Sequence, residues 1–403
     1  MDTDRLWTKN YILLIVASFG TAMLVALFFN TLPLYAERLS GAATYAGLVT
    51  TAYSIAALAT RPVVGVMATR YSRVKLMLIG IILMTIACYC YTYATVIFFL
   101  IALRVVQGIG FGIKSTASGV LAAEIIPPSR FAEGIGMYGF YIPVANAIGP
   151  AVGLWVVGSA GMAGFHKLFI IAGVIGIVSF IIMMFVRPAP PDSDTETGAK
   201  NEIGKEDLPK TIFGFEFGVV YPSIVLMLMY FGHSAVTTFV PIFAMSKGWT
   251  GVGFFYTISA ISLFTARLFY SKMAKRYGFH KFTIGSLILF SGALFVIPFL
   301  QSQSQLYILA CFYGAAQGIV PMVINTQVLM RCSVQRRGTA IASYTSSMDI
   351  GIGLGAIVLG IVADAMGYST TFIIAGLASV FSLIVYCTTI MRDEEKYSKY
   401  IVC

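Results

Sequence analysis

Charged residues are scarce in this sequence of 403 residues. Only 11% of the residues are Asp, Glu, Lys or Arg, whereas 58% are hydrophobic, and the mean hydropathy is +0.85. Soluble globular domains carry about 25% charged residues. This shortage of charge excludes a chain that folds mainly in water, and it indicates that most of the chain lies within a membrane.

Features that enzymes need are also missing. We find no nucleophile elbow and no metal-ligand cluster, and Gly108-x-Gly110-x-Gly112 lies inside an apolar run that follows no strand, so it is no dinucleotide-binding loop. The six cysteines show neither metal nor disulfide spacing. We therefore expect no catalytic activity, no metal and no cofactor. The longest loop has only about thirty residues, which argues against a non-transporting receptor or scaffold.

Long apolar runs are abundant instead. A helix needs about 20 apolar residues to cross the hydrocarbon core of a membrane, because each residue adds about 1.5 Å of length. The apolar residues form continuous runs and do not alternate with polar ones, so we expect helices. Twelve runs meet this requirement, at about residues 11–35, 43–66, 76–94, 96–122, 134–157, 168–186, 219–243, 250–270, 282–299, 306–329, 339–363 and 370–390.

Basic residues are concentrated on one side of these expected spans. If the N-terminus is cytoplasmic, twenty Lys and Arg residues fall on its side and only Arg38, Lys167 and Lys247 fall on the other. Cytoplasmic loops of membrane proteins carry such an excess. We therefore expect a multi-pass plasma-membrane protein, in a bacterium an inner-membrane protein, with both termini in the cytoplasm. The net charge of +10 is expected to face anionic lipid headgroups and not nucleic acid.

The sequence also repeats itself. Residues 60–75, TRPVVGVMATRYSRVK, match residues 266–281, ARLFYSKMAKRYGFHK, at six positions with an offset of 206, and Arg61 corresponds to Arg267. Further along each copy, Gln107-Gly108-Ile109 is expected to correspond to Gln317-Gly318-Ile319. A polar, proline-rich stretch separates the copies. The expected units are an N-terminal six-helix bundle at 1–187, a cytoplasmic linker at 188–216 and a C-terminal six-helix bundle at 217–403.

Three short motifs carry a family resemblance. The loop after the second span of each half contains Gly65, Thr69, Arg70, Ser72, Arg73 and Lys75 in one copy and Ser271, Lys275, Arg276, Gly278 and Lys281 in the other. The fourth span begins with Arg104, Gln107 and Gly108, and the fifth carries Gly136, Ala145, Gly149, Pro150 and Gly153. Together these residues resemble the major facilitator superfamily, and the fifth-span pattern is similar to that of its drug/proton antiporters. The aspartate of the family's loop motif is replaced by Thr69.

The resemblance implies a fold and a mode of action. It implies an all-α membrane protein with 12 transmembrane helices, arranged as two six-helix bundles related by pseudo-twofold symmetry. Such a protein is a secondary transporter that works by alternating access, with a small-molecule substrate and H⁺ as partners, and we expect a monomer in the membrane lipid.

The loop motif is expected to act as a conformational latch. The resemblance implies that it holds the two halves together in the outward-facing state, with Glu124 as the acidic partner of the arginines. The alternative is that these cations only set the topology, because basic residues at a span's end bind headgroups and helix carbonyls. The residues assigned to the latch are Gly65, Arg70, Arg73, Lys75, Glu124, Arg276, Gly278 and Lys281.

The fifth span is expected to contain an antiporter-type hinge. Gly149, Pro150 and Gly153 fall within one helix. Glycines allow close helix approach, and a proline frees a carbonyl and kinks the helix. Ordinary packing of small residues is the alternative.

Polar residues at membrane depth are costly and are usually functional. Arg104, Gln107 and Lys114 recur on one face of the fourth span, and a seam of small residues lies beside them. We expect that face to line the central cavity and the seam to pack within the N-terminal half. Lys114 is expected either to contact substrate or to pair with an acid. Arg61 and Arg267 lie near the cytoplasmic ends of their spans, from which they can extend to the interface.

Asp349 is the only acid well inside a span, so it is the first candidate for proton coupling, with a static pair to Arg or Lys or a bond to Ser346 as alternatives. His233 lies halfway along the seventh span and is a candidate for coupling or a structural residue. Depth and polarity select further cavity candidates, which are Asn30, Tyr53, Asn146, Tyr230, Asn325 and Gln327.

The favoured function is proton-coupled efflux of a small amphipathic solute or drug. The first span has no acid between Asn10 and Glu37, whereas Arg104 and Lys114 lie in the fourth span. This balance favours an anionic or zwitterionic solute, and a neutral one remains open. A proton-coupled importer or exchanger of an organic anion or metabolite is the alternative within transport.

Overall fold

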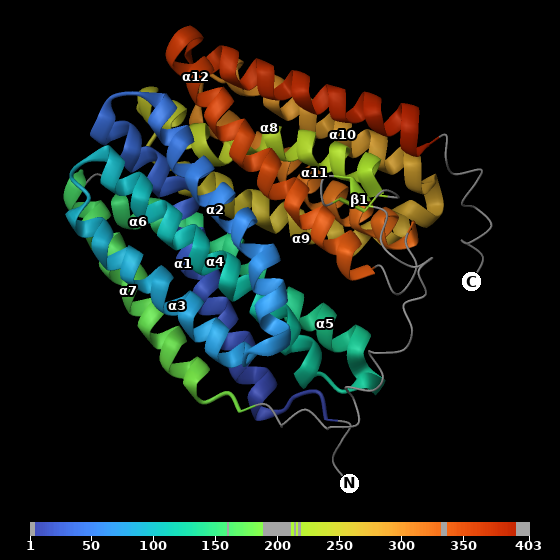
Figure 1. Ribbon diagram of the computed structural model, residues 1–403. Coiled ribbons are helices and arrows are strands. Elements are labelled where there is room, and N and C mark those ends of the chain that lie inside the picture. The colour runs from blue at the N-terminus through green and yellow to red at the C-terminus, as the bar shows by residue number, and fades with distance from the viewer. Residues whose placement is uncertain are drawn as a thin grey trace.

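The computed structural model describes residues 5–158, 161–187, 211–212, 215–216, 219–331 and 337–391. Within these ranges, eleven segments are helical, long and apolar enough to cross a membrane. The last of them, Ala340–Ile390, contains two crossings, because Gly367 has non-helical backbone angles and the chain turns back there (Figure 1). The expected all-α membrane fold with twelve crossings is therefore confirmed.

Each half contributes its helices in chain order. The N-terminal half contains α1 (Lys9–Ser40), α2 (Ala43–Arg70), α3 (Arg73–Cys90), η1 (Tyr91–Tyr93), α4 (Ile97–Ile125), η2 (Pro128–Arg130), α5 (Phe131–Gly139), α6 (Tyr141–Val157) and α7 (Met162–Met184). The C-terminal half contains α8 (Val220–Ser246), α9 (Val252–Tyr277), α10 (Phe279–Val296), η5 (Ile297–Phe299), α11 (Gln303–Met330), α12 (Arg337–Val385) and η7 (Tyr386–Ile390). The fifth crossing thus consists of α5 and α6 together.

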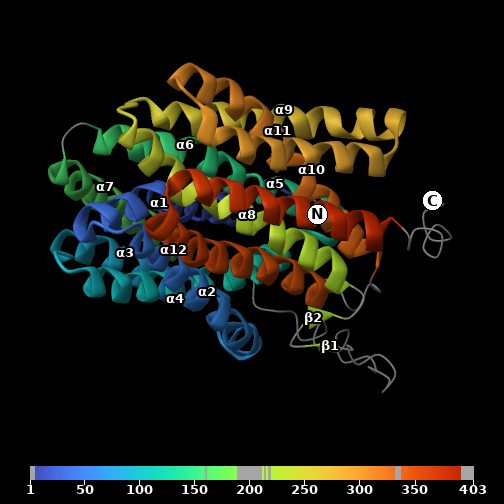
Figure 2. The ribbon, with the colours of Figure 1, turned by 90° about the horizontal axis from the view of Figure 1, so that it is seen from above.

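The two halves lie side by side as separate bundles (Figure 1). In Figure 2, α9 and α11 lie on one flank, α2, α3 and α4 lie on the opposite flank, and α1, α8 and α12 lie between them. The halves meet mainly where α2 packs on α12, α6 on α9 and α1 on α8. The linker contains a small antiparallel hairpin of β1 (Thr211–Ile212) and β2 (Phe215–Glu216), and residues 188–210 lie outside the described residues.

Close glycine contacts set the true register of the repeat. A methyl group on Gly108 would clash with the carbonyl oxygen of Tyr53, and one on Gly314 would clash with that of Ser259. Both pairs are related by the offset of 206. The expected match of Gln107-Gly108-Ile109 with Gln317-Gly318-Ile319 is therefore wrong by four residues, about one helical turn. The two identical Gln-Gly-Ile tripeptides therefore do not occupy equivalent positions. The close contacts between helix backbones define which residues of the two halves correspond.

Turns between helices collect at two ends of the molecule. We call the end with the α2–α3, α4–α5 and α9–α10 turns the basic end, since Arg70, Arg73 and Lys281 lie there, and we call the other the opposite end. At the basic end, the side-chain amide of Asn10 donates to the carbonyl of Arg187 at 2.6 Å and so joins α1 to the end of α7. Gly41 and Gly367, with φ of 75° and 82°, form turns at the opposite end.

Hydrogen bonds join the two halves at the opposite end. The helix α2 has no side-chain cap of its own. Instead, the carboxylate of Asp364 in α12 accepts from the backbone N–H groups of Ala43 and Thr44, at 2.7 and 2.8 Å. A carboxylate at a helix N-terminus satisfies unpaired donors and opposes the helix dipole favourably. Nearby, the hydroxyl of Thr51 donates to the carbonyl of Gly353 at 2.6 Å. These contacts close the space between the halves at the opposite end.

Candidate functional site

A cavity of about 390 Å³ lies between the two halves. Both halves contribute its wall, through α1, α6, α8, α9, α11 and α12. A larger pocket of about 770 Å³ is lined by α9, α10 and α11 alone, and its side chains include Ile261 and Phe269, which are exposed on the outer surface. That second pocket belongs to the lipid-facing surface of one half. Of these two pockets, the central cavity is the one that lies between the halves and so would change its access when they move.

One wall of the central cavity is aromatic. His233 and Tyr230 project from α8, and Tyr313 projects from α11. The rings of His233 and Tyr313 are nearly parallel, with an interplanar angle of 4° and 6.2 Å between centroids, and Nδ1 of His233 is hydrogen-bonded to the hydroxyl of Tyr313. Tyr230 packs edge to face against the ring of His233, at 5.2 Å between ring centroids. This wall offers flat apolar surfaces to a ligand, as is usual for small-molecule pockets.

Unpartnered polar atoms face the aromatic wall. Asn30 of α1 is buried, and neither its amide nitrogen nor its amide oxygen has a hydrogen-bond partner. The hydroxyl of Ser259 in α9 is buried and unpartnered as well. Buried polar groups normally have partners, so these atoms are available to a ligand or to water. Asn146 of α6 also lines the cavity, as the sequence indicated for Asn30, Asn146, Tyr230 and His233.

Arg267 is the charged residue of the cavity wall. The expectation that it extends to the membrane interface is not met, because its Nε donates to the carbonyl of Gly318 at 3.0 Å and its side chain lines the cavity. Among the described residues that line the cavity, it alone is an Arg, Lys, Asp or Glu. No described acid pairs with it.

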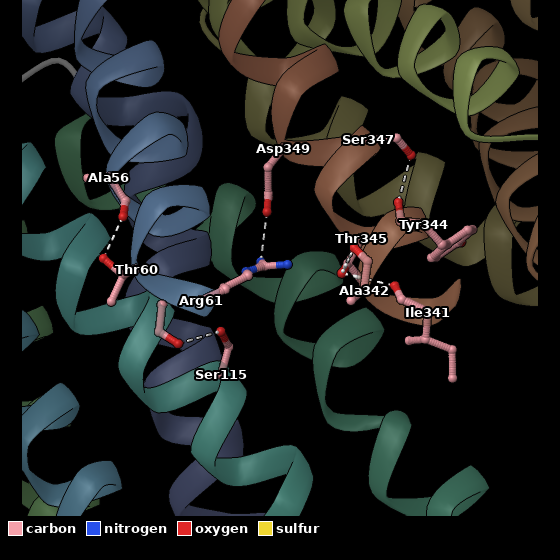
Figure 3. A network of polar contacts seen from close by, with 11 residues as sticks. Ala56, Thr60, Arg61, Ser115, Ile341, Ala342, Tyr344, Thr345, Ser347 and Asp349 are labelled. Carbon is pink, nitrogen blue, oxygen red and sulfur yellow. Dashed lines mark hydrogen bonds and ion pairs between the residues drawn. The ribbon is translucent and has the colours of Figure 1, made fainter. Parts of the chain in front are cut away.

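Asp349 faces Arg61 across the boundary between the halves (Figure 3). The Nη2 atom of Arg61 in α2 lies 2.9 Å from Oδ2 of Asp349 in α12. Both side chains keep about a fifth of their surface exposed, at 21% and 18%. Arg61 therefore does not extend to the interface as expected, and Asp349 has the Arg partner that was one of its alternatives. The neighbouring hydroxyl groups of Thr60, Thr345 and Ser347 bond to carbonyls of their own helices (Figure 3).

The polar face of α4 points into the N-terminal half. The Nη1 atom of Arg104 donates to Oε1 of Gln107 at 2.8 Å, and the hydroxyl of Tyr91 donates to the same oxygen at 2.8 Å. The guanidinium also lies 4.9 Å from the ring centroid of Tyr53 and bonds to the carbonyl of Val49. The expectation that Arg104 and Gln107 line the central cavity is therefore wrong in this structure. The adjacent glycine seam packs on α2, as expected.

Lys114 is buried on the same face and meets neither of its expected partners. Its Nζ lies 3.4 Å from the hydroxyl of Tyr141 and 4.8 Å from that ring's centroid, and its side chain is 2% exposed. It does not line the central cavity, and it makes no ion pair with a described acid. A helix face that is polar in sequence can face the interior of one bundle, because tyrosine hydroxyls and ring faces solvate the cation.

Three other cavity candidates also lie elsewhere. Tyr53 packs under Arg104, and neither Asn325 nor Gln327 of α11 lines the cavity. These residues were selected by depth and polarity, which do not report the rotation of a helix. The cavity positions that α11 supplies are Tyr313, Gln317 and Pro321.

The expected latch residues lie at the basic end. Nε of Arg73 lies 2.8 Å from Oε1 of Glu124, as an ion pair between α3 and α4. Both residues belong to the N-terminal half, so the pair does not bridge the halves here, and the latch stays a prediction. Gly65, Arg70 and Lys75 are exposed nearby, and the Arg276 side chain lies outside the described residues. Gly278 has a φ of 89° between α9 and α10, whereas its equivalent Ser72 has a φ of −58°.

The expected hinge residues form a packing contact. A methyl group on Gly149 would lie 2.9 Å from the backbone carbon of Ala26, and one on Gly153 would lie 2.7 Å from the carbonyl oxygen of Leu27. Pro150 lines the central cavity. The glycines therefore let α6 approach α1 closely. Whether the span also bends during transport stays a prediction.

Sequence reasoning missed two residues that the structure singles out. Arg267 was expected to extend to the membrane interface, and Asp364 was not among the candidates. For Arg267, the repeat gives only its equivalence to Arg61, and the ion pair of Arg61 with Asp349 is known from the structure alone. For Asp364, no local pattern marks a carboxylate that caps a helix of the other half.

Known proteins resemble this chain over nearly its whole length. Its sequence matches the profile of the Major Facilitator Superfamily over residues 14–266 and 250–400. It is 25% identical over 363 residues to the staphylopine export protein of Staphylococcus aureus, covering 88% of this chain and 89% of that protein. It is 24% identical to the quinolone resistance protein NorA of the same species, over 55% of each chain.

Solved structures share the fold. A bacterial homologue of the human lysosomal transporter Spinster, in an inward-facing and occupied conformation, superposes with a TM-score of 0.78. The superposition covers 94% of this chain and 96% of that chain at 16% sequence identity. At this identity the likeness shows the fold alone.

Proposed function

The chain belongs to the Major Facilitator Superfamily and is a multi-pass secondary transporter, and from this premise we propose that it exports a small amphipathic solute in exchange for protons. One observation carries the proposal. The central cavity is built from both halves and is closed at the opposite end by contacts of one half with the other. Rocking of the halves about this cavity would close the basic end and open the opposite end.

The basic end is proposed to face the cytoplasm. Basic residues gather there, and the positive-inside rule relates such a surplus to the cytoplasmic side. The structure then corresponds to a state closed toward the outside. Contacts between the halves in the described residues include the Arg61–Asp349 pair and the nearly parallel rings of Phe140 and Phe264.

Asp349 is proposed as the proton-coupling group. It joins the two halves through Arg61, so protonation would remove the charge that holds this contact. Attraction between opposite charges at 2.9 Å is strong where water is partly excluded. Loss of the negative charge would therefore favour separation of α2 from α12 at this level. Proton uptake and the change of access are coupled in this way through one ion pair.

The direction of transport rests on the similar proteins. Two relatives are named for export or drug resistance, the staphylopine export protein and the quinolone resistance protein NorA. Import of an organic anion in symport with protons is the second candidate, and Arg267 in the cavity wall favours it as much as export of an anion. The wall residues His233, Asn146 and Tyr230 are proposed as substrate contacts in either direction.

Proteoliposomes test this function. The purified protein is reconstituted into liposomes with an acidic interior, and uptake of norfloxacin, 1-naphthylacetate and ethidium is measured as zwitterionic, anionic and cationic probes. We expect at least one probe to be taken up faster than by protein-free liposomes with the same gradient. Molecules inserted with their cytoplasmic side facing outward would move probe into the liposome while protons leave it. Nigericin, which collapses the pH gradient, should abolish the difference. Uptake of all three probes at the protein-free level would contradict the proposed function.

A further inference from the structure

Two of the interfaces between the halves, α2 on α12 and α9 on α6, are copies of one another. Gly47 of α2 packs against Ala356 of α12, and Gly253 of α9 packs against Ala151 of α6. Gly47 and Gly253 are related by the offset of 206, and Ala356 and Ala151 by 205. The α2–α12 and α9–α6 interfaces therefore have the same construction to within one residue. A group present in one of them predicts the position of its counterpart in the other.

One charged group has no counterpart. The pair of Arg61 and Asp349 belongs to the α2–α12 interface. Its equivalents by the offset of 206 are Arg267 and Pro143, so the α9–α6 interface keeps the cation and lacks the acid. An acid is also missing nearer the opposite end, because Gly158 occupies the position equivalent to Asp364. The missing acid leaves Arg267 without a described ion-pair partner.

The unpaired cation lies where a ligand can reach it. Arg267 and Pro143 both line the central cavity. Nε of Arg267 is engaged with the carbonyl of Gly318, and its two terminal nitrogens have no described partner. Unpaired charges at membrane depth are costly and usually mark a binding function. A guanidinium binds carboxylates through two parallel hydrogen bonds, and the terminal nitrogens leave this mode open.

The rest of the wall suits the other parts of such a ligand. The side chains of Asn30 and Ser259 present unpartnered polar atoms, and Tyr230, His233 and Tyr313 present ring faces. A cavity of about 390 Å³ accommodates a molecule of one or two rings with a short acidic arm.

We propose that the substrate supplies the missing acid: an aromatic or otherwise apolar solute whose carboxylate binds Arg267 in the place that the Asp349 carboxylate takes beside Arg61. This inference rests on the proposed transport function and assigns a substrate class to the same cavity. Binding of the anion completes the second interface between the halves. Substrate and proton then act on equivalent positions of the two interfaces. The substrate brings a negative charge to Arg267 of α9, and the proton removes the negative charge of Asp349 in α12.

Thermal stability of the purified protein tests the proposal without any transport measurement. The probes are 1-naphthylacetate, its neutral isostere 1-naphthylacetamide, and acetate alone. A ligand that binds only the folded protein raises its unfolding temperature, and at a fixed ligand concentration the rise grows with the logarithm of the affinity. We expect naphthylacetate to bind roughly tenfold or more tightly than the other two, since charge-assisted hydrogen bonds add that much affinity.

Variants at Arg267 and Pro143, alone and combined, separate the role of Arg267 from general packing. The preference for the anion should persist in Pro143→Asn and disappear in Arg267→Gln. It should also disappear in Pro143→Asp, because the introduced carboxylate would pair with Arg267. Pro143→Asp should be more stable than Pro143→Asn without ligand, and this gain should vanish when Arg267→Gln is added.

The proposal is overturned if the unmodified protein prefers naphthylacetate no more than naphthylacetamide or acetate, or if Arg267→Gln keeps the preference. Failure of the transport function looks different. In that case the anion preference and its loss in the variants remain, whereas the proteoliposomes show no gradient-dependent uptake of any probe.

Discussion

At the scale of single residues, four charged side chains within the described spans show three kinds of environment. Arg61 and Asp349 form a pair between the halves, Arg267 faces the cavity without an acid, and Lys114 is enclosed by one bundle. Removing one member of a partly buried pair leaves the other charge uncompensated, which is costly in a medium of low dielectric constant. The first of these environments is the one in which we propose that a proton acts, because protonation of Asp349 would remove the charge that holds Arg61.

Substitution of Asp349 by Asn removes the charge and keeps the shape. We expect gradient-driven uptake into proteoliposomes to fall by about tenfold or more, because the variant cannot load or release a proton at this contact. Exchange of labelled for unlabelled probe across liposomes without a gradient should continue, since it needs no net proton movement. Undiminished uptake that still depends on the pH gradient would show that another group carries the proton.

At the scale of helices, small residues decide how closely elements approach. The helix α6 packs against α1 through Gly149 and Gly153, and α4 packs against α2 through Gly108 and Gly112. In both contacts a glycine faces backbone atoms of the neighbouring helix, where a side chain has no room. Without a hydrophobic driving force between helices in lipid, such close packing supplies much of the association energy.

Gly149→Ala tests the α6–α1 contact. The new methyl group would lie 2.9 Å from the backbone carbon of Ala26 and 3.1 Å from the backbone nitrogen of Leu27. Overpacking of this kind costs about 1–3 kcal/mol, so we expect a lower unfolding temperature in detergent.

Gly136→Ala is the matched control. Gly136 lies in α5 of the same span, and nothing lies within 4 Å of a methyl group placed on it. This variant should unfold at the temperature of the unmodified protein or slightly above it, because alanine favours helix more than glycine does. Equal destabilisation by both substitutions would mean that flexibility of the span, and not its packing on α1, is what these glycines provide.

At the scale of the whole molecule, the opposite end acts as a gate in the proposed cycle. Thr44 of the N-terminal half and Asp364 of the C-terminal half are hydrogen-bonded there. A disulfide in their place would hold this end closed, so the protein could not change its access.

The double substitution Thr44→Cys and Asp364→Cys should therefore block transport. In a background without the six native cysteines, we expect oxidation to stop uptake into proteoliposomes and a reducing agent to restore it. Each single substitution, treated in the same way, is the control and should keep its uptake. Continued transport by protein that is fully cross-linked, as judged by gel mobility after cleavage in the linker, would contradict alternating access at this gate.

Some features of the molecule follow from the sequence alone. The membrane location and the number of crossings are set by composition, since each apolar run is long enough to span the hydrocarbon and contains little that needs water. The duplicated plan follows from the repeat at an offset of 206. The loop motif identified the family, which the profile match confirms. These properties depend on short segments of the chain or on sums over it, so the sequence alone predicts them.

The positions of side chains in the site were decided only by the tertiary structure. Arg104 and Lys114 belong to a face that looked suited to the cavity, yet the rotation of α4 turns that face into its own bundle. Arg61 and Asp349 are 288 residues apart, and nothing along the chain records their contact. Helix rotation and register depend on backbone approach between distant segments, such as Gly108 on Tyr53. For this reason, the sequence established what kind of molecule forms, and packing established which charges meet.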